Sequence, residues 1–347
     1  MPSTADYLPI RNFGYRKEKI PMQKNTLKIY VQTICWFGEY IIDWSDPGIL
    51  YRLSERQEGL DNISYGSLFD GAIASSDNVY ALIYQRLGTK GLLLKNGRLM
   101  REVNRSYYQA DVYEYPAAFF IYDGRTYLAH CPLAYNRIDF EDVETGEVIT
   151  GKTPRTLVDS FYSRLEVGPG NKYLLSKGWG WHPVNITQVY DIAACFEKPA
   201  MLDVYNELTS PLSGEICTAS FISDSKILVG PPEELIRDDG SPDAKNTLRS
   251  YCVLDMTTGT YTPSVAAEVE IGNLIAIDEY YAWDTYKYPK VIALVTGRVV
   301  DKDETVFSGD CKSSIIREDE PHLAINAARD KLVIKNGNEI TLVGWER

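Results

Sequence analysis

A hairpin-like unit recurs along this chain and limits its fold more than any other feature. In each copy an apolar run reaches a turn and is followed at once by a second apolar run. Runs rich in Val, Ile, Tyr and Leu that are separated by Gly, Asp, Asn and Pro are typical of β-strands joined by tight turns. The copies lie at residues 41–53, 91–103, 137–149, 250–262, 291–300 and 331–343.

The turns of these units return at a nearly regular spacing. The turn glycines are Gly48, Gly97, Gly146, Gly259, Gly297 and Gly337, which are separated by 49, 49, 113, 38 and 40 residues. Glycine is favoured there because hairpin turns need a positive φ that other side chains resist. The gap of 113 residues holds two periods and an insertion, and residues 188–202 are interpreted as a seventh pair of strands without the glycine.

A second pair of strands precedes several of these turns, most clearly at residues 117–131, 217–230, 273–286 and 323–335. Two pairs make a four-stranded unit of about 40 to 50 residues, which is typical of a β-propeller blade. A small sheet cannot bury both of its faces alone. Neighbouring blades must therefore stack, and closing the ring protects the end blades.

The sequence thus predicts an all-β protein, a single β-propeller domain over residues 1–347 with seven blades, or six, of four-stranded antiparallel sheets. Two β-sandwich domains are the alternative. The last unit has three strands, so residues 7–13 or 27–34 are expected to supply the strand that closes the ring. Residues 231–247 are polar, acidic and rich in turn formers, which predicts an exposed insertion loop.

Two segments carry a resemblance to a known group of proteins. In VLDMTTGTY (253–261) and FEDVETGEV (140–148) a strand runs into an acidic residue and a Thr-Gly turn. On these residues the chain resembles bacterial β-propellers of the WD40-like, YVTN-like or quinoprotein-like superfamily, over most of its length. The Gly-His and Trp-Asp dipeptides of true WD40 repeats are missing, and Trp44-Ser45-Asp46 only approximates the second of them.

The charge of the chain narrows the classes of partner. Lys and Arg total 36 against 48 Asp and Glu, which gives a formal net charge of -12. Such a charge repels nucleic acids and anionic membranes and attracts basic proteins. We therefore expect a protein partner, and neither nucleic acid nor membrane. The N-terminus lacks an apolar core after a basic start, and no apolar window is long enough to span a bilayer, which predicts a cytoplasmic protein.

Signatures of catalysis and of metal or cofactor binding are absent from the sequence. The six cysteines lie far apart without a C-x-x-C pair, which favours reduced, buried thiols. The three histidines, His130, His182 and His322, are 52 and 140 residues apart, a spacing that supports no metal site. No nucleophile elbow, phosphate loop or H-E-x-x-H motif occurs. We expect no catalytic residue, metal or cofactor, and enzymatic activity is the less favoured interpretation.

The most distinctive chemistry of the sequence is aromatic. Residues 177–185 hold two tryptophans and a histidine, residues 278–289 hold a run of Tyr and Trp, and residues 106–116 add four tyrosines. Loop Trp and Tyr are enriched at protein interfaces because they offer rigid contact area with a hydrogen-bonding tip. Core packing between blades is the alternative for all three segments. The predicted binding residues are Trp179, Trp181, His182, Tyr280, Tyr281 and Trp283.

Three classes of function fit these observations. The leading hypothesis is a non-enzymatic protein-binding module whose top loops, including 177–185 and 231–247, hold a basic partner. An immunity- or inhibitor-type protein that binds a basic toxin is one concrete form of it. The alternatives are a carbohydrate-active propeller enzyme that uses channel carboxylates as acid and base, and a structural or assembly protein. The sequence does not indicate an oligomeric state.

Overall fold

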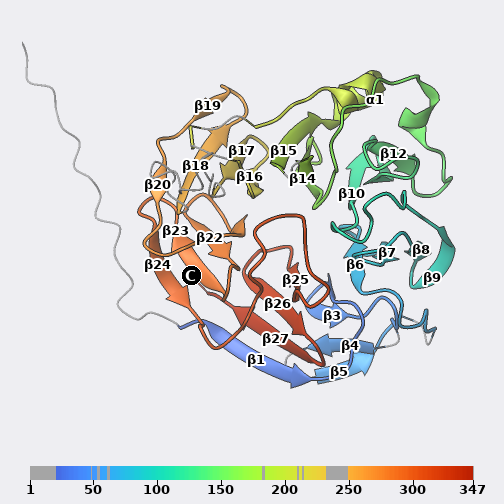
Figure 1. Cartoon of the computed structure of the whole chain (residues 1–347). Helices are drawn as coiled ribbons and strands as arrows, with labels where there is room; N and C mark the ends of the chain where they lie inside the picture. The colour runs from blue at the N-terminus through green and yellow to red at the C-terminus, as the bar shows by residue number, and fades with distance from the viewer. Residues whose placement is uncertain are drawn as a thin grey trace, which may run out of the picture.

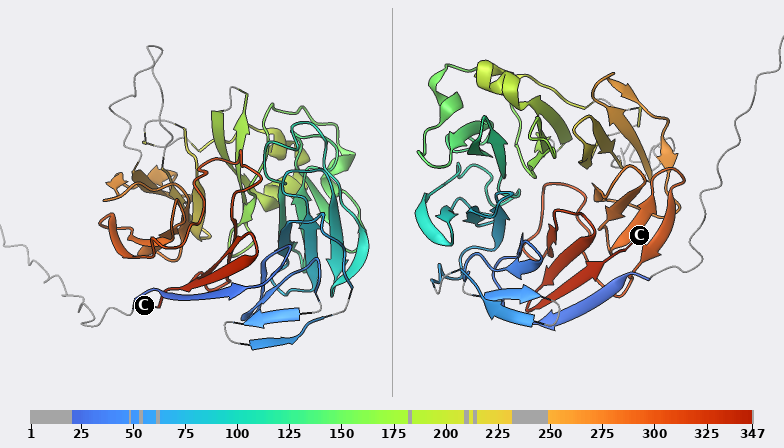
Figure 2. Two further views of the ribbon diagram at one scale, coloured as in Figure 1. Left: turned by 60° about the horizontal axis from the view of Figure 1, so that its bottom comes forward. Right: turned by 180° about the vertical axis from the view of Figure 1, so that it is seen from behind.

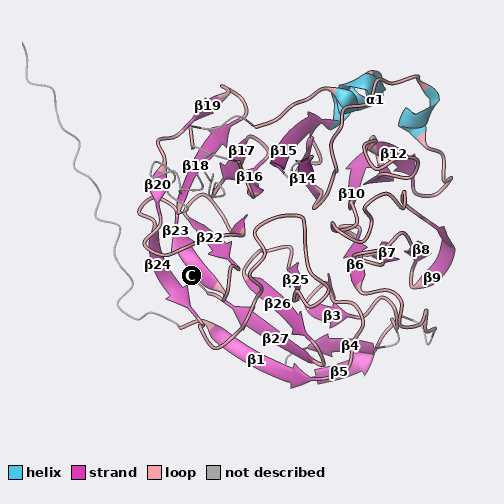
Figure 3. Ribbon diagram, viewed as in Figure 1, coloured by secondary structure: helices cyan, strands magenta, loops and turns pink. Residues whose placement is uncertain are grey.

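Seven small antiparallel sheets form a ring of blades (Figure 1). Residues of all seven blades line one cavity, which lies in the central channel of the ring. This computed structural model describes residues 21–47, 49–52, 55–60, 63–181, 184–208, 211–212, 215–231 and 249–346. The all-β, seven-bladed propeller that the sequence predicts is confirmed. Helices are limited to three short segments of the described chain, which Figure 3 shows in cyan.

The strands follow one another around the ring in chain order. Blade 1 contains β2 (Cys35–Phe37), β3 (Tyr40–Ile42), β4 (Ile49–Arg52) and β5 (Glu55–Glu58); blade 2 contains β6 (Gly71–Ala74), β7 (Tyr80–Tyr84), β8 (Gly91–Lys95) and β9 (Arg98–Glu102). Blade 3 contains β10 (Ala117–Tyr122), β11 (Arg125–His130) and β12 (Asp139–Asp142); blade 4 contains β13 (Glu166–Val167), β14 (Tyr173–Gly180) and β15 (Val184–Asp191).

The remaining three blades complete the ring. Blade 5 contains β16 (Ala219–Ser223), β17 (Lys226–Val229), β18 (Ser250–Asp255), β19 (Thr260–Tyr261) and β20 (Val265–Ala266); blade 6 contains β21 (Leu274–Ala276), β22 (Tyr281–Asp284), β23 (Lys290–Ala293) and β24 (Arg298–Lys302). Blade 7 contains β25 (His322–Ile325), β26 (Lys331–Asn336), β27 (Glu339–Gly344) and β1 (Gln23–Lys28).

Three blades depart from the four-stranded pattern that the sequence predicts. In blade 5 a fifth strand, β20, pairs with β18. The described parts of blades 3 and 4 form sheets of three strands. In place of a fourth strand, Val148 makes a single bridge to Glu141 in blade 3, and Glu207 makes one to Gln188 in blade 4. The 3-10 helix η1 (Ile149–Lys152) directly follows Val148, so the chain leaves the sheet before a ladder can form.

The interpretation of residues 188–202 as a pair of strands is wrong after its first four residues. Strand β15 ends at Asp191, and α1 (Ile192–Glu197) and the 3-10 helix η2 (Pro199–Asp203) follow. The Asp191 carboxylate accepts a hydrogen bond of 3.0 Å from the Ala194 N–H, which is a helix N-cap. This cap stabilises a short helix where the apolar pattern alone is compatible with a strand.

Apolar side chains of neighbouring blades interdigitate and hold the ring together. Between blades 6 and 7, for example, Trp283 and Val291 pack with Leu332, Ile334 and Val343, and all five are buried. Burial of each such side chain stabilises the folded state by about 1.5–3 kcal/mol. The core therefore lies mainly between the sheets rather than within any one of them.

The ring closes by pairing the first described strand with the last. Strand β1 runs antiparallel to β27, from the pair Gln23 and Gly344 to the pair Lys28 and Glu339, and the two lie side by side in Figure 2. The sequence predicted closure by an N-terminal strand but placed it differently. Of the two proposed segments, 27–34 contributes only its first two residues to β1, and 7–13 lies outside the described residues.

We call the end of the ring at which the first strand of each blade begins the upper face. In a four-stranded antiparallel blade, loops between the second and third strands and loops into the next blade share one end. Loops 103–116 and 303–321 therefore lie on the upper face. The predicted insertion loop 231–247 joins β17 and β18 on that face too, but only Pro231 of it is described.

The closing strand gives a first testable prediction. A chain that starts at residue 29 lacks β1, so β27 keeps β26 as its single ladder partner and Leu27 leaves the core between blades 7 and 1. We expect the free energy of unfolding to fall by about 3–5 kcal/mol, as measured by chemical denaturation. A chain that starts at residue 21 is the control and should match the full chain. Equal stability of the two truncated chains would contradict closure by β1.

Candidate functional site

Aromatic side chains from four segments meet on the upper face. We call them the aromatic cluster: Tyr108, Tyr113, Tyr135, Phe161, Trp179 and Trp181. At its base the rings of Phe161 and Trp179 stack with centroids 3.9 Å apart and planes within 5°. Tyr113 packs edge-on against both rings, at 5.5 and 6.2 Å. These three side chains are buried and form a rigid support.

The backbone fixes the stacked pair as well. The Phe161 N–H donates to the Trp179 carbonyl at 2.8 Å, and the Trp179 N–H donates to the Phe161 carbonyl at 3.0 Å. A Cβ at position 178 would lie 2.0 Å from the Phe161 oxygen. Gly178 is therefore required by the close approach of two backbone segments.

The outer part of the cluster faces solvent. Trp181 is 45% exposed and Tyr108 is 38% exposed, while Tyr135 is half-buried. The Tyr108 ring lies 4.9 Å from that of Tyr135 and 6.2 Å from that of Trp181, measured between centroids. We call these three residues the aromatic surface. The neighbouring Tyr107 is 83% exposed, so the loop offers a further ring to a partner.

Carboxylates accompany the aromatic surface. The Tyr135 hydroxyl donates to the Asp159 carboxylate at 2.8 Å, and Asp159 is exposed. Burial, together with this carboxylate, raises the pKa of Tyr135 to about 12, so its hydroxyl stays protonated. Asp111 lies exposed on the loop that carries Tyr108. Ring faces and carboxylates both attract cations, so this surface suits a positively charged group.

A buried arginine that sequence reasoning missed holds the loop of Tyr108 in place. The Arg105 guanidinium donates to the backbone carbonyls of Gly88, Ala110 and Tyr113 at 2.6–2.9 Å. It also lies over the Tyr113 ring, 4.6 Å from its centroid. Burial lowers the pKa of Arg105. Among the described residues, Arg105 bonds to backbone carbonyls and a ring face and forms no ion pair with a carboxylate. Its role is therefore to position the loop.

A long connection crosses the upper face and reaches the base of the cluster. We call residues 303–321, between β24 and β25, the strap; Figure 1 shows it extending into the middle of the ring. Its Ile315 forms a bridge with Tyr113 and packs against the buried part of the cluster. The Arg164 side chain donates to the Lys312 carbonyl at 3.4 Å. The strap, which connects blade 6 to blade 7, thus contacts the connection between blades 2 and 3 and the connection between blades 3 and 4.

The predicted residues of segment 177–185 have three different placements. Trp179 is buried at 4% exposure, and Trp181 is exposed. His182 lies outside the described residues. Near the end of β14, Trp179 therefore packs in the core, and Trp181, two residues further on, faces solvent.

The predicted residues of segment 278–289 are not brought to the aromatic cluster. Tyr280 lies in the turn between β21 and β22, at the end of blade 6 away from the upper face, and is 59% exposed. Tyr281 is half-buried. Trp283 is fully buried, and its indole N–H donates to the Arg329 carbonyl at 2.9 Å. Of these three, only Tyr280 offers a largely exposed ring to a partner.

Carboxylates line the central channel, as the carbohydrate hypothesis requires. Glu166 accepts from Lys177 at 2.7 Å and from Arg329 at 3.3 Å. Burial raises the pKa of Glu166, but these two cations outweigh it, so the pKa lies below its usual value. Glu114 lies 3.7 Å from Arg86. A general acid needs a raised carboxyl pKa, and Glu166 has the opposite shift.

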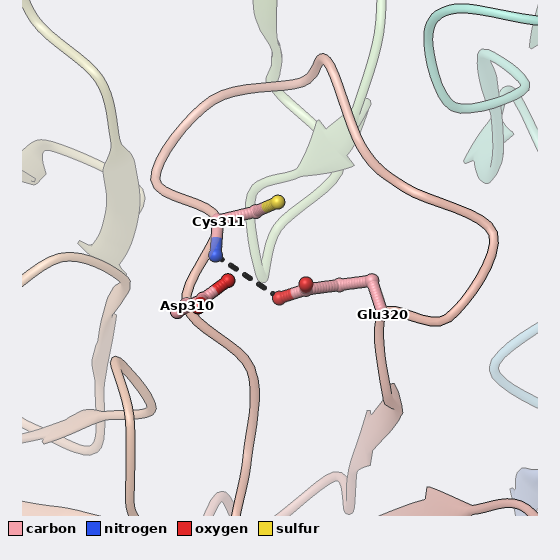
Figure 4. Close-up of side chains that lie close together, drawn as sticks. All are labelled: Asp310, Cys311 and Glu320. Atoms are coloured by element: carbon pink, nitrogen blue, oxygen red, sulfur yellow. Dashed lines mark hydrogen bonds between the residues drawn. The ribbon is translucent and has the colours of Figure 1, made fainter.

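One group in the strap has the donor types of a metal site (Figure 4). Oxygen and sulfur atoms of Asp310, Cys311 and Glu320 lie within 4.8 Å of one another. The Arg317 guanidinium already pairs with Asp310 at 2.5 Å and with Glu320 at 3.5 Å. Burial and Glu320 raise the pKa of the Cys311 thiol to about 11, which disfavours the thiolate that binds metals. We interpret the group as an ion-paired turn.

Comparisons with known proteins support the fold and do not assign this chain to a protein family. No family model and no curated protein matches this chain. A chain from the crystal structure of a mitotic checkpoint complex is similar over 99% of this chain and 100% of that chain, with a TM-score of 0.57 and 10% sequence identity. At that identity the likeness shows the fold alone, which is a β-propeller. None of the described helices is long and apolar enough to cross a membrane.

Two tryptophans of one strand end make a matched pair for mutation. Trp179→Ala removes the ring that stacks on Phe161, so we expect the free energy of unfolding to fall by about 3–5 kcal/mol. Trp181→Ala removes a half-exposed ring and should cost about 1 kcal/mol or less. Urea denaturation of both variants measures the difference. If both variants lost a similar free energy of unfolding, the Trp181 ring would be part of the core.

A histidine at the channel end gives a pH prediction. Burial, with Arg86 and Lys335 nearby, lowers the pKa of His322 from 6.5 to about 2. Below pH 6.5 the unfolded chain binds a proton that the folded chain excludes, so stability falls with falling pH. We expect a slope of about 0.7 kcal/mol per pH unit at pH 6.5 that rises towards about 1.4 below about pH 5.5. Urea denaturation of His322→Asn should show a smaller slope than the wild type, and an unchanged slope would contradict this assignment.

Proposed function

We propose that this protein is a non-enzymatic protein-binding module that holds a basic partner against the aromatic surface of its upper face. The observation that carries the proposal is the pairing of solvent-facing Tyr108 and Trp181 with a buried, stacked support. Rigid aromatic side chains of this kind contribute most to binding at protein interfaces because little conformational entropy is lost when they are covered.

Charge supports a basic partner. The chain has a formal net charge of -12. Asp159 is exposed and bonds to the Tyr135 hydroxyl, and Asp111 is exposed on the loop that carries Tyr108. A partner that presents Lys or Arg would gain both ring-face and carboxylate contacts. An immunity- or inhibitor-type protein that binds a basic toxin is the narrower form of the proposal, since such a pair needs strong electrostatic complementarity.

The alternative of a carbohydrate-active enzyme has weaker support. It requires one protonated and one ionised carboxyl group on either side of a substrate. Glu166 and Glu114 in the channel are engaged by cations. Size-exclusion chromatography distinguishes a structural or assembly role from partner binding. A structural role predicts a stable homo-oligomer and no captured partner.

The binding proposal predicts which variants lose affinity. The partner is captured from a lysate of the host at low salt, identified by mass spectrometry, and produced pure for equilibrium binding. Trp181→Ala and Tyr108→Ala should each weaken the Kd by about 30-fold, which corresponds to about 2 kcal/mol. Binding to the wild type should also weaken as salt is raised, because charge contributes to it.

Tyr280→Ala is the matched control for these measurements. It removes an exposed ring at the opposite end of the ring of blades, so its affinity should equal that of the wild type. If Tyr280→Ala loses affinity and Trp181→Ala does not, the partner binds the other face. If both variants keep full affinity for the captured protein, the aromatic surface is not its binding site.

A further inference from the structure

A second cavity lies at the end of the ring opposite the upper face, which we call the lower face. It is found where the first strands of blades 7, 1 and 2 reach their turns, and its volume is about 420 Å³. We call it the lower cavity. Of the described residues that line it, ten have apolar side chains, three have uncharged polar side chains and none is charged. The lower cavity is therefore an apolar site, and it lies away from the aromatic surface.

The lower cavity is open to solvent at its rim. Gly38, Ser76 and Ala327 line it and are exposed. Its deeper wall includes Ile73 and Ile325, which are half-buried. An apolar group that enters displaces water from this wall, which favours binding by about 25 cal/mol for each Å² of apolar surface covered. The small side chains at the rim leave the entrance unobstructed.

The strands that form the wall of the lower cavity have one free edge each. Strands β2, β6 and β25 stand at the inner ends of their sheets, and each pairs with a single neighbour among the described strands. An edge strand presents backbone N–H and C=O groups with which a further strand can pair. The Trp36 indole already donates to the Ala324 carbonyl at 3.1 Å, which ties blade 1 to blade 7 at this wall. The other edges suit an extended peptide, which binds by main-chain hydrogen bonds and places alternate side chains in pockets.

Acidic turns surround the lower face. The turns that join the first and second strands of each blade lie there, because successive turns of an antiparallel sheet alternate between its two ends. They are residues 38–39, 75–79, 123–124, 168–172, 224–225, 277–280 and 326–330. Together these turns contain seven carboxylates and two cations. The three turns next to the lower cavity contribute Glu39, Asp77 and Asp330.

The cations of the lower face do not cancel this charge. Arg329, one of the two in the turns, reaches into the ring, where it pairs with Glu166 at 3.3 Å and donates to the Ala276 carbonyl at 2.9 Å. From the neighbouring strands, Lys331 pairs with Glu39 and Lys226 pairs with Glu279. These lysines offset two of the seven carboxylates. The mouth of the lower cavity therefore attracts positive charge.

We propose that the lower cavity binds an extended peptide segment of a protein partner, in which an aliphatic side chain is flanked by lysines or arginines. The aliphatic side chain fills the apolar cavity, and the peptide backbone pairs with a free strand edge. The basic side chains lie against the acidic turns, which excludes acidic segments by like-charge repulsion. This inference does not depend on the proposed partner binding at the aromatic surface, which is on the upper face.

The test uses the full chain and a synthetic probe, the fluorescently labelled peptide Lys-Val-Ile-Val-Lys, with binding measured by fluorescence anisotropy at low salt. The control peptides are Glu-Val-Ile-Val-Glu, which reverses the flanking charge, and Lys-Val-Asp-Val-Lys, which places a charge in the apolar cavity. We expect each control to bind weaker by about tenfold or more. Failure of the first peptide to bind would overturn the proposal. Equal binding of the glutamate peptide would also overturn it and would assign the cavity to an uncharged apolar ligand.

Two adjacent alanines give a matched pair of variants that locates the site. Ala327 and Ala328 are both exposed in the same turn, and of the two only Ala327 lines the lower cavity. Ala327→Trp should obstruct the entrance and weaken the Kd of the lysine peptide by about tenfold or more, whereas Ala328→Trp should keep the wild-type Kd. Equal Kd values for the two variants would place the peptide elsewhere. A wild-type dimer in size-exclusion chromatography that only Ala327→Trp dissociates would instead assign the cavity to a second copy of this chain.

Discussion

Pairing between β1 and β27 is the constraint on which the rest of the structure depends. Each blade buries its faces only against its neighbours, so an open ring would expose one face of blade 1 and one of blade 7. The pairing fills the outer position of blade 7 with a strand from the other end of the chain, and a core of both blades, including Ile41 and Val333, lies beneath it. The channel and the upper face keep their shape because the ring is closed.

The upper face combines two kinds of support. The aromatic cluster rests on a stacked pair, Phe161 and Trp179, whose backbones also pair. Its loop from blade 2 is fixed by a buried guanidinium, that of Arg105, which binds carbonyl oxygens. Apolar stacking sets the position of the rings, and charged hydrogen bonds set the path of the loop. Rings held in this way lose little freedom when a partner covers them.

The fold was largely predictable from the sequence because turns and strands leave local signals. Asn96 and Gly97 both have positive φ, as a type I′ turn requires, and this pair marks blade 2. The site was less predictable, because its contacts join distant residues. Nothing local distinguishes Phe161 as the partner of Trp179, or Ile315 as a neighbour of Tyr113. Arg105 is an ordinary loop residue until the carbonyls around it are known. The Asp191 cap was a local signal that the apolar pattern obscured.

The strap is the element that the channel and the aromatic cluster share. Its residues Ser308 and Cys311 line the cavity in the central channel, and a few residues further on Ile315 packs under the aromatic cluster. A change in the strap at the channel would therefore reach the support of the aromatic cluster. By thermodynamic linkage, a group that favours one strap conformation in the channel and a protein that favours one at the aromatic surface would change each other's affinity by the same factor.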